Sequence, residues 1–220
     1  MASNTNASSL IWQNYVDLQN DVIPWIQETI TTQAQVMKLQ LLTDMTCQWA
    51  QGKIGRPIAP TTFDRRFNGW AGWNGAYVEL PYYPVLEITS VTEWWGVSGP
   101  HVLSEQTPTN QVDGFTCEYE RGILTRVFPG MVQKPWFPGS RNIEVVWTAG
   151  YNPIPADLKV ATLEMIAHWW RNTQQQSANR IGGAGLADEY APEVVASGLW
   201  TGTPNRLLTI LDSYLEIGIA

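Results

Sequence analysis

The segment RNIEVVWTAGYNPIPADLKVATLEMIAHWWRN (141–172) constrains the fold more than any other part of the chain. In its first third, Ile143, Val145 and Trp147 alternate with more polar neighbours, which is the period of a strand with one apolar face. Gly150 then allows a tight turn that residues with a Cβ would resist. The first half of the segment therefore predicts a strand that ends in a sharp corner.

The second half of this segment predicts the start of a helix. Pro155 suits a first helical turn, where its missing N–H has no helical partner, and the carboxylate of Asp157 favours the positive helix end. Apolar residues then follow at helical spacing: Leu158, Thr162, Met165 and Trp169. We expect a joint between sheet and helix, formed by Trp147, Gly150, Tyr151, Pro155 and Asp157.

Helical patterns flank a β-rich middle. Residues 24–51 carry an apolar stripe that predicts one long helix, about 40 Å in length. Residues 155–173 and 204–217 predict two further helices. Hence we expect an α+β fold: a helical bundle, with a long N-terminal helix and central and C-terminal helices, that contains an inserted β-rich subdomain. The expected parts of this single domain are an N-terminal helical part (1–54), the β-rich insert (55–150) and a C-terminal helical part (151–220).

Composition excludes several classes of protein. A hydrophobic content of 44% in 220 residues excludes a mostly disordered chain. The net charge of −7 disfavours a protein whose main work is to bind phosphate backbones. The start, MASNTNASSL, lacks the pattern of a secretory signal, and no apolar run reaches membrane-spanning length. We therefore expect a protein made in the cytoplasm, with Cys47 and Cys117 as reduced thiols.

No catalytic or metal-binding constellation emerges from the residue types. Glu118 and Glu120 have a spacing that two glycosidase carboxylates can use, but they lie opposite an apolar strand face and more plausibly face solvent. His101 and His168 lack a second ligand at zinc spacing. The twelve tryptophans could act as sugar-stacking platforms. The better interpretation is that they pack in the core and at interfaces. We expect no enzyme activity, no cofactor and no metal.

Four segments, in order, resemble the head–tail connector (adaptor) proteins of tailed phages, which form a ring beneath the portal. The joint VVWTAGYNPIPADLK (145–159) matches that family's closing segment, a strand that ends in an aromatic, then Thr-Ala-Gly-Tyr, a proline and a helix that begins Pro-Ala-Asp-Leu-Lys. The other three are LPYYPVLEITSVTEWW (80–95), GILTRVFPGMVQKPWFPGSRNIEVVW (122–147) and GTPNRLLTILDSYL (202–215). The similarity spans about residues 25–216.

The resemblance implies a structural virion protein at the head–tail interface. It implies a homo-oligomeric, dodecameric ring that docks on the portal protein, meets a stopper or tail-completion protein and extends the conduit through which DNA passes. The partner interface that we expect combines an apolar stripe on the last helix with two basic residues: Leu207, Leu208, Leu211, Tyr214, Leu215, Arg65 and Arg66. The two arginines could equally protect an edge strand from pairing with another chain. Two alternatives stay open, a tail-associated carbohydrate-binding or carbohydrate-active protein and a DNA-packaging accessory.

Overall fold

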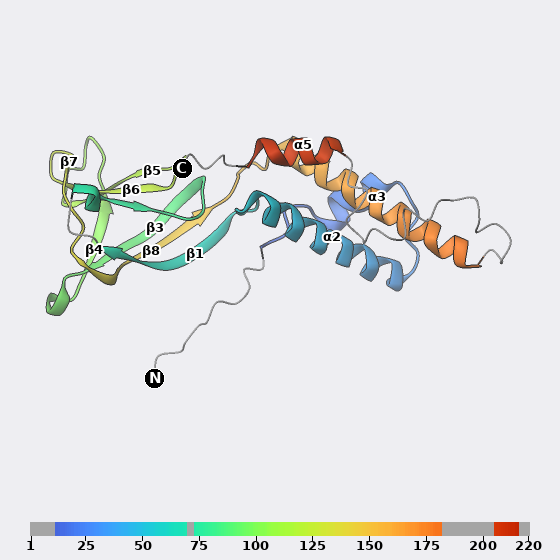
Figure 1. Ribbon diagram of the computed structural model, residues 1–220, viewed down its shortest axis with the longest axis horizontal. Helices are drawn as coiled ribbons and strands as arrows, with labels where there is room; N and C mark the ends of the chain where they lie inside the picture. The colour runs from blue at the N-terminus through green and yellow to red at the C-terminus, as the bar shows by residue number, and fades with distance from the viewer. Residues whose placement is uncertain (1–11, 70–72, 182–204, 216–220) are drawn as a thin grey trace. The chain divides into compact units, whose positions relative to one another are not determined.

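The computed structural model describes residues 12–69, 73–181 and 205–215, with side chains at 12–69, 75–173 and 208–215. The chain divides into two units (Figure 1). The helical unit combines Met1–Gly55 with Ile154–Ala220, and the β unit is Arg56–Pro153.

One mixed sheet contains all the strands that the structure describes in the β unit. Its order is β1-β8-β3-β4-β5-β6-β2, and β7 pairs with β6. The β4–β5 pair is parallel and every other pair is antiparallel. The strands are β1 (Thr61–Gly69), β2 (Tyr77–Glu79), β3 (Val85–Trp94), β4 (Pro100–Glu105), β5 (Gly114–Glu118), β6 (Ile123–Phe128), β7 (Val132–Gln133) and β8 (Gly139–Ala149), with short 3₁₀ turns η2 (Trp73–Ala76) and η3 (Gly96–Ser98).

The predicted fold class, a helical bundle with an inserted β subdomain, is wrong. The largest hydrogen-bonded element is the eight-stranded sheet, and only three longer helices accompany it among the described residues: α2 (Gln33–Ile54), α3 (Ala156–Ile181) and α5 (Asn205–Ser213). The physical reason is that β1, β3 and β8 pair along most of their length, with Thr61 and Val85 both opposite Ala149. Local patterns identify single strands but do not show that distant strands join into one dominant sheet.

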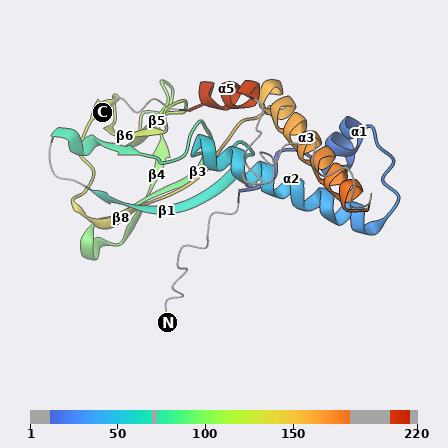
Figure 2. The same ribbon diagram turned by 45° about the vertical axis from the view of Figure 1, so that its right-hand side comes forward.

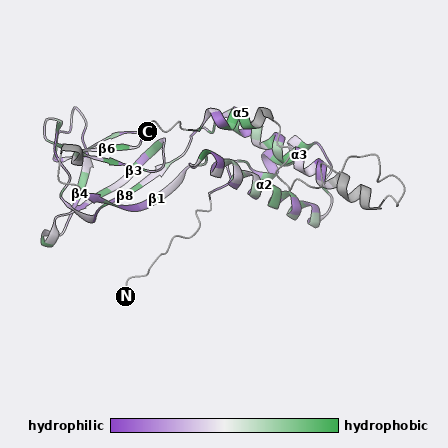
Figure 3. Ribbon diagram, viewed as in Figure 1, coloured by the Kyte–Doolittle hydropathy of each residue, from purple (hydrophilic) through white to green (hydrophobic). Residues whose placement is uncertain are grey.

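Strand β8 has the predicted alternation. Ile143, Val145 and Trp147 are fully buried on one face, and Trp147 contacts the rings of Phe63 and Phe67 from β1. The opposite face is polar: Arg66 pairs with Glu144 at 3.0 Å between Nε and Oε1. Hydrophilic residues are prominent along β1 in Figure 3. The sheet thus has one apolar and one solvated face in this region.

The predicted long helix 24–51 is interrupted. A π-helical turn η1 (Leu18–Val22) leads into α1 (Ile23–Ile26), which ends where Gln27 takes a left-handed conformation with φ 58°. The helix α2 starts only at Gln33, where Thr32 and Gln35 form a capping box. This reciprocal cap satisfies backbone N–H groups and so fixes a new helix start inside the expected helix.

The apolar stripe predicted for residues 24–51, which includes Met37 and Leu41, is not the buried face of the helix. Met37 is 66% exposed and Leu41 58% exposed. The buried face instead consists of Leu39, Leu42, Thr43, Thr46, Cys47, Ala50, Gln51 and Ile54. Two threonines can lie on it because their hydroxyls donate to backbone carbonyls one turn earlier, which removes the cost of burying an unpaired hydroxyl.

Helices α2 and α3 lie side by side, and α5 packs on both, as Figures 1 and 2 show. The Tyr15 hydroxyl hydrogen-bonds Thr162 in the interior, and Lys159 pairs with Asp21 at 2.7 Å. The helix α3 continues to Ile181, eight residues past the predicted helix end at 173; residues 182–204 lie outside the described part. None of the helices in the described ranges is long and apolar enough to cross a membrane.

Candidate functional site

The candidate site is built around an arginine with no exposed surface. Arg126, on β6, donates from Nε to Glu93 at 3.2 Å, and from Nη1 and Nη2 to the two carboxylate oxygens of Asp113 at 2.7 and 3.0 Å. Nη1 also donates to the carbonyls of Gly114 and Val127. Each of the three guanidinium nitrogens thereby has at least one protein acceptor, as a buried charge requires.

Two carboxylates and a lysine complete what we term the charged network: Glu93, Asp113, Arg126 and Lys134. Glu93 is only 1% exposed and accepts hydrogen bonds from the Trp95 indole N–H at 2.9 Å and the Phe137 backbone N–H at 2.5 Å. Lys134 pairs with Asp113 at 2.9 Å. Partial burial acts to raise the pKa of Asp113, but hydrogen bonds and charges from Arg126 and Lys134 outweigh it and hold the pKa below its usual value.

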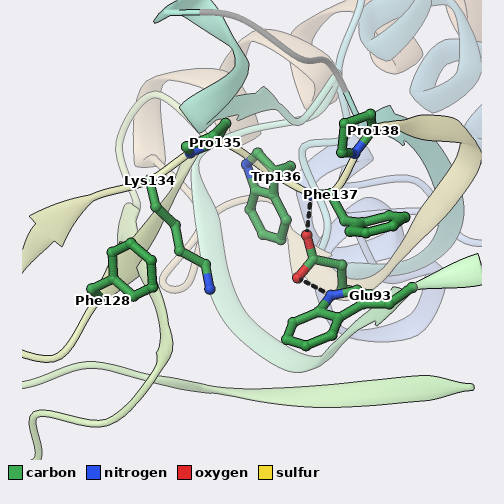
Figure 4. Close-up of a pocket in the computed structure, with 8 residues that line it drawn as sticks. Glu93, Phe128, Lys134, Pro135, Trp136, Phe137 and Pro138 are labelled. Carbon is green, nitrogen blue, oxygen red and sulfur yellow. Dashed lines mark hydrogen bonds between the residues drawn. The ribbon is translucent and has the colours of Figure 1, made fainter. Parts of the chain in front are cut away.

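An apolar pocket of about 400 Å³ adjoins the network (Figure 4). In Figure 4 the carboxylate of Glu93 receives the Phe137 backbone N–H, and the Lys134 side chain extends beside the ring of Phe128. The Lys134 ammonium lies 4.3 Å from the centre of that ring and 5.7 Å from that of Trp95. This end pocket is lined by Glu93, Trp95, Phe128, Lys134, Pro135, Trp136, Phe137 and Pro138.

The loop 134–138, which forms one wall of the end pocket, has all its backbone donors engaged. The N–H of Lys134 donates to Arg126, that of Trp136 to Gly75 and that of Phe137 to Glu93. The two prolines have no N–H to satisfy. The Trp136 indole also donates to the Ala76 carbonyl at 2.9 Å. The wall is therefore fixed before any ligand arrives.

Chemically, the end pocket is suited to binding rather than to reaction. Its one buried carboxylate is already the acceptor of three hydrogen bonds, from Trp95, Arg126 and Phe137. Among the described residues, no group of three or more His, Cys, Asp or Glu side chains is placed to hold a metal ion. Burial raises the pKa of Cys47 to about 11, and burial followed by the charges of Glu105 and Glu118 raises that of Cys117 to about 12, which deactivates both thiols as nucleophiles.

A second pocket, of about 480 Å³, lies in the helical unit between α1 and α3. Its lining mixes polar and apolar side chains, including Trp25, Glu164 and Arg171. The Nε2 atom of His168, also in this lining, is hydrogen-bonded to Asn172 at 3.0 Å.

The joint residues have defined structural roles. Trp147 is fully buried, and its indole donates to the Tyr82 carbonyl at 3.2 Å. Gly150 has φ 133°, and a Cβ there would lie 2.6 Å from the Ala59 carbonyl oxygen. The Tyr151 N–H donates to Ile58, and the Pro155 carbonyl accepts the first helical bond of α3. Asp157 accepts a hydrogen bond from the Tyr214 hydroxyl at 2.8 Å.

The expected partner interface falls on two separate elements. Arg65 and Arg66 lie on β1, an edge strand; Arg65 stacks over Tyr82, and Arg66 over Trp94. On α5, Leu211 is only 2% exposed and Leu208 is half-buried, while the side chain of Leu207 lies outside the described part. Tyr214 and Leu215 follow the end of the helix at Ser213 and are also half-buried.

The residues that the sequence offered as catalytic, metal-binding or sugar-stacking groups have structural contacts instead. Glu118 pairs with Arg121 and Glu120 is exposed in the turn after β5. His101 stacks on Trp95 with 3.9 Å between ring centres. Trp136, Trp147 and Trp170 are at most 1% exposed, which removes them as surfaces for sugar stacking.

The charged network and the end pocket were not anticipated from the sequence. A signal was present: Arg126 stands two residues after Leu124 on β6, and Glu93 two after Val91 on β3. In both strands a charged residue occupies a position on the buried, apolar face. Such a position requires a buried partner of opposite charge.

Comparison with known proteins adds a structural likeness. No family model and no curated protein matches the chain. A chain from the "neck of empty GTA particle computed with C6 symmetry" matches with a TM-score of 0.51 and 14% identity over 87% of this chain and 82% of that chain. A chain from the "virion of native gene transfer agent (GTA) particle" matches with a TM-score of 0.50 and 15% identity over the same shares. The protein therefore has the fold of chains found in the neck and virion of a gene transfer agent particle.

Proposed function

We propose that this protein is a structural subunit of the neck of a tailed phage or phage-like particle. The observation that carries the proposal is the fold likeness to a neck chain, which extends over 87% of this chain and 82% of the other. The four sequence segments that resemble head–tail adaptors are independent support, because that resemblance lies in the residues themselves and not in the fold.

In this proposal identical subunits form a dodecameric ring under the portal protein. Copies meet head to tail, in heterologous contacts that close into a cycle. A stopper or tail-completion protein adds to the other side, and DNA passes through the lumen. The protein is made in the host cytoplasm, becomes part of the virion at the head–tail interface and acts by shape rather than by catalysis.

A passive conduit must not hold DNA. A net charge of −7 on each copy, repeated around a ring, favours repulsion between the wall and phosphates. Asp17, Asp21 and Glu28 are candidates for lumen residues. In the free chain Asp17 caps η1, Asp21 pairs with Lys159 and Glu28 accepts a hydrogen bond from the Trp170 indole at 2.5 Å.

The helix α5 is the proposed contact with the portal. Leu211 of α5 is buried within the helical unit, so α5 is also part of the core of that unit. Deletion of the helix is therefore an ambiguous test, because loss of portal binding could result from unfolding. The half-buried Leu208 offers a sharper one, since Leu208→Glu changes a residue that is not enclosed by the unit. We expect this variant to remain folded by near-UV circular dichroism and to lose portal binding. Normal portal binding by the folded variant would remove α5 from the interface.

The experiment that tests the proposed function is reconstitution. The purified full-length protein is mixed with purified portal rings from the same particle, and the product is imaged by cryo-electron microscopy. We expect one added ring per portal with cyclic symmetry. Failure to bind portal, together with binding to a glycan array, would replace the structural reading with the carbohydrate-binding one.

A further inference from the structure

We propose that the end pocket is a socket for an extended segment of the tail-side neck protein, which inserts an uncharged apolar residue. The inference rests on the proposed function, because it names a partner within the neck. It is argued from the position of the pocket, its rim, its charge balance and a neighbouring strand edge.

The position of the end pocket is at one end of the sheet. The chain starts β1 and finishes β8 at the same end, where Thr61 lies opposite Ala149. The pocket lies at the other end, where Gly69 lies opposite Gly139, because its loop 134–138 leads directly into β8 and Trp95 directly follows β3. The socket thus lies at the end of the β1–β8 pair opposite to the start of β1 and the finish of β8.

The rim of the socket is apolar and exposed. Phe128 and Phe137, which line the pocket, are 48% and 42% exposed. Val132, which pairs with Phe128, is 60% exposed, and its neighbour Met131 is 45% exposed. Single exposed apolar residues are ordinary, but four within the ten residues 128–137, next to an apolar pocket, form the kind of surface that binding covers. An anchor side chain of a partner would be enclosed by aromatic rings on several sides.

The charges around the socket specify an uncharged occupant. The network contains two cations and two anions, and each is within 3.2 Å of an opposite charge. A phosphate or a charged side chain would have to compete with these internal pairs, whereas an apolar side chain leaves them intact. This charge balance argues against DNA and against an acidic or basic peptide.

A strand edge beside the socket specifies an extended occupant. Within the described part of the chain, β7 pairs with β6 and with no other strand, and both of its residues are exposed. Its outer edge can pair with the backbone of a partner, while a side chain of that partner enters the adjacent pocket. Because the loop 134–138 is already fixed by its hydrogen bonds, little ordering cost opposes this binding.

The source of the segment is a different protein rather than a second copy. Val97, the most exposed of the large apolar residues described in the β unit, follows Trp95 by two positions and therefore lies at the same end of the sheet. Two copies that met through this end would place like surfaces face to face, which gives a two-fold pair. A ring of head-to-tail copies joins two different surfaces instead. We assign this end of the sheet to neither of them, because the proposed ring also has to meet a component on its tail side.

The test compares Phe137→Asp with Leu86→Asp in the full-length protein. Phe137 contributes to the fold through its backbone groups, while its ring is 42% exposed, so the variant is expected to fold. Leu86 is 36% exposed on β3 and is the matched control. Each variant is bound to portal rings, and the affinity for the purified tail-side neck protein is measured by biolayer interferometry.

We expect both variants to form rings on the portal and Phe137→Asp to lose tail-side binding by about tenfold or more, as truncation of an anchor residue does. Leu86→Asp should stay within about twofold. As a second readout, oxidation of Met131 by dilute peroxide should slow when the tail-side protein binds to the wild type.

Unchanged tail-side binding by Phe137→Asp would overturn the socket while leaving the neck function intact. Loss of ring formation by Phe137→Asp, with normal rings from Leu86→Asp, would assign the socket to a second copy or to the portal and also overturn the inference. Absence of rings with the wild type would instead refute the proposed function itself.

Discussion

Arg126 holds both oxygens of the Asp113 carboxylate, at 2.7 and 3.0 Å, while the guanidinium itself has no exposed surface. Asp113 precedes β5, and the same guanidinium reaches Glu93 at the end of β3. One side chain therefore ties two separate parts of the β unit to β6. The arrangement makes the position of the end pocket depend on a single buried cation.

Loss of that cation should be severe. Arg126→Met leaves Glu93 buried without its cation, which we expect to lower the free energy of unfolding by about 3–5 kcal/mol. The double variant Arg126→Met/Glu93→Gln should be less destabilised than the sum of the single variants, since neither charge is then left alone. Urea denaturation followed by circular dichroism measures these differences. Arg65→Met on the exposed edge strand is the control, and a cost below about 1 kcal/mol for Arg126→Met would contradict the role of the network.

The charged network should also make the stability of the folded protein depend on pH in the acidic range. The pKa of Asp113 is lower in the folded protein than the ordinary value of about 3.9. A depressed pKa contributes stability that is present above about pH 4 and is lost as the pH falls through the folded pKa. Melting temperatures between pH 7 and pH 3 should fall less steeply for Asp113→Asn than for the wild type. Glu120→Gln, in an exposed turn, should follow the wild type; identical slopes for all three proteins would exclude this contribution.

Two glycines should respond oppositely to alanine. Gly150→Ala places a Cβ 2.6 Å from the Ala59 carbonyl at φ 133°, so we expect a loss of about 1–3 kcal/mol or more. Gly52→Ala lies within α2, with no other atom within 4 Å of the new Cβ, and should stabilise by about 0.5–1 kcal/mol. Thermal unfolding of the two variants gives the signs directly. A neutral Gly150→Ala would show that the corner can relax.

Duplex DNA should not bind the isolated protein at physiological salt. The net charge of −7 provides no excess of cations to release counterions. Fluorescence anisotropy with a labelled 30-base-pair duplex, repeated at two salt concentrations, measures this. Micromolar or tighter affinity that weakens steeply with salt would contradict the passive conduit and revive the reading as a DNA-packaging accessory.

The sequence determined the elements whose cause is local. The alternation of Ile143, Val145 and Trp147 specified β8 and its buried face, and Gly150 with Pro155 specified the corner and the start of α3. These features follow from side-chain period and backbone freedom, which act over a few residues. The same local reasoning failed at α2, because the Thr32–Gln35 cap and two internally bonded threonines changed its start and its buried face.

The tertiary structure decided which distant residues meet. Arg126, Glu93 and Asp113 are charged residues in three different segments, and only the pairing of β5 with β6, and the β3–β4–β5 order of the sheet, brings them together. The dominance of the sheet over the helices has the same origin, since strand pairing joins residues up to 88 positions apart, as Thr61 and Ala149 show. Sequence patterns fix the face on which a residue lies, whereas the partner across that face is set by long-range packing.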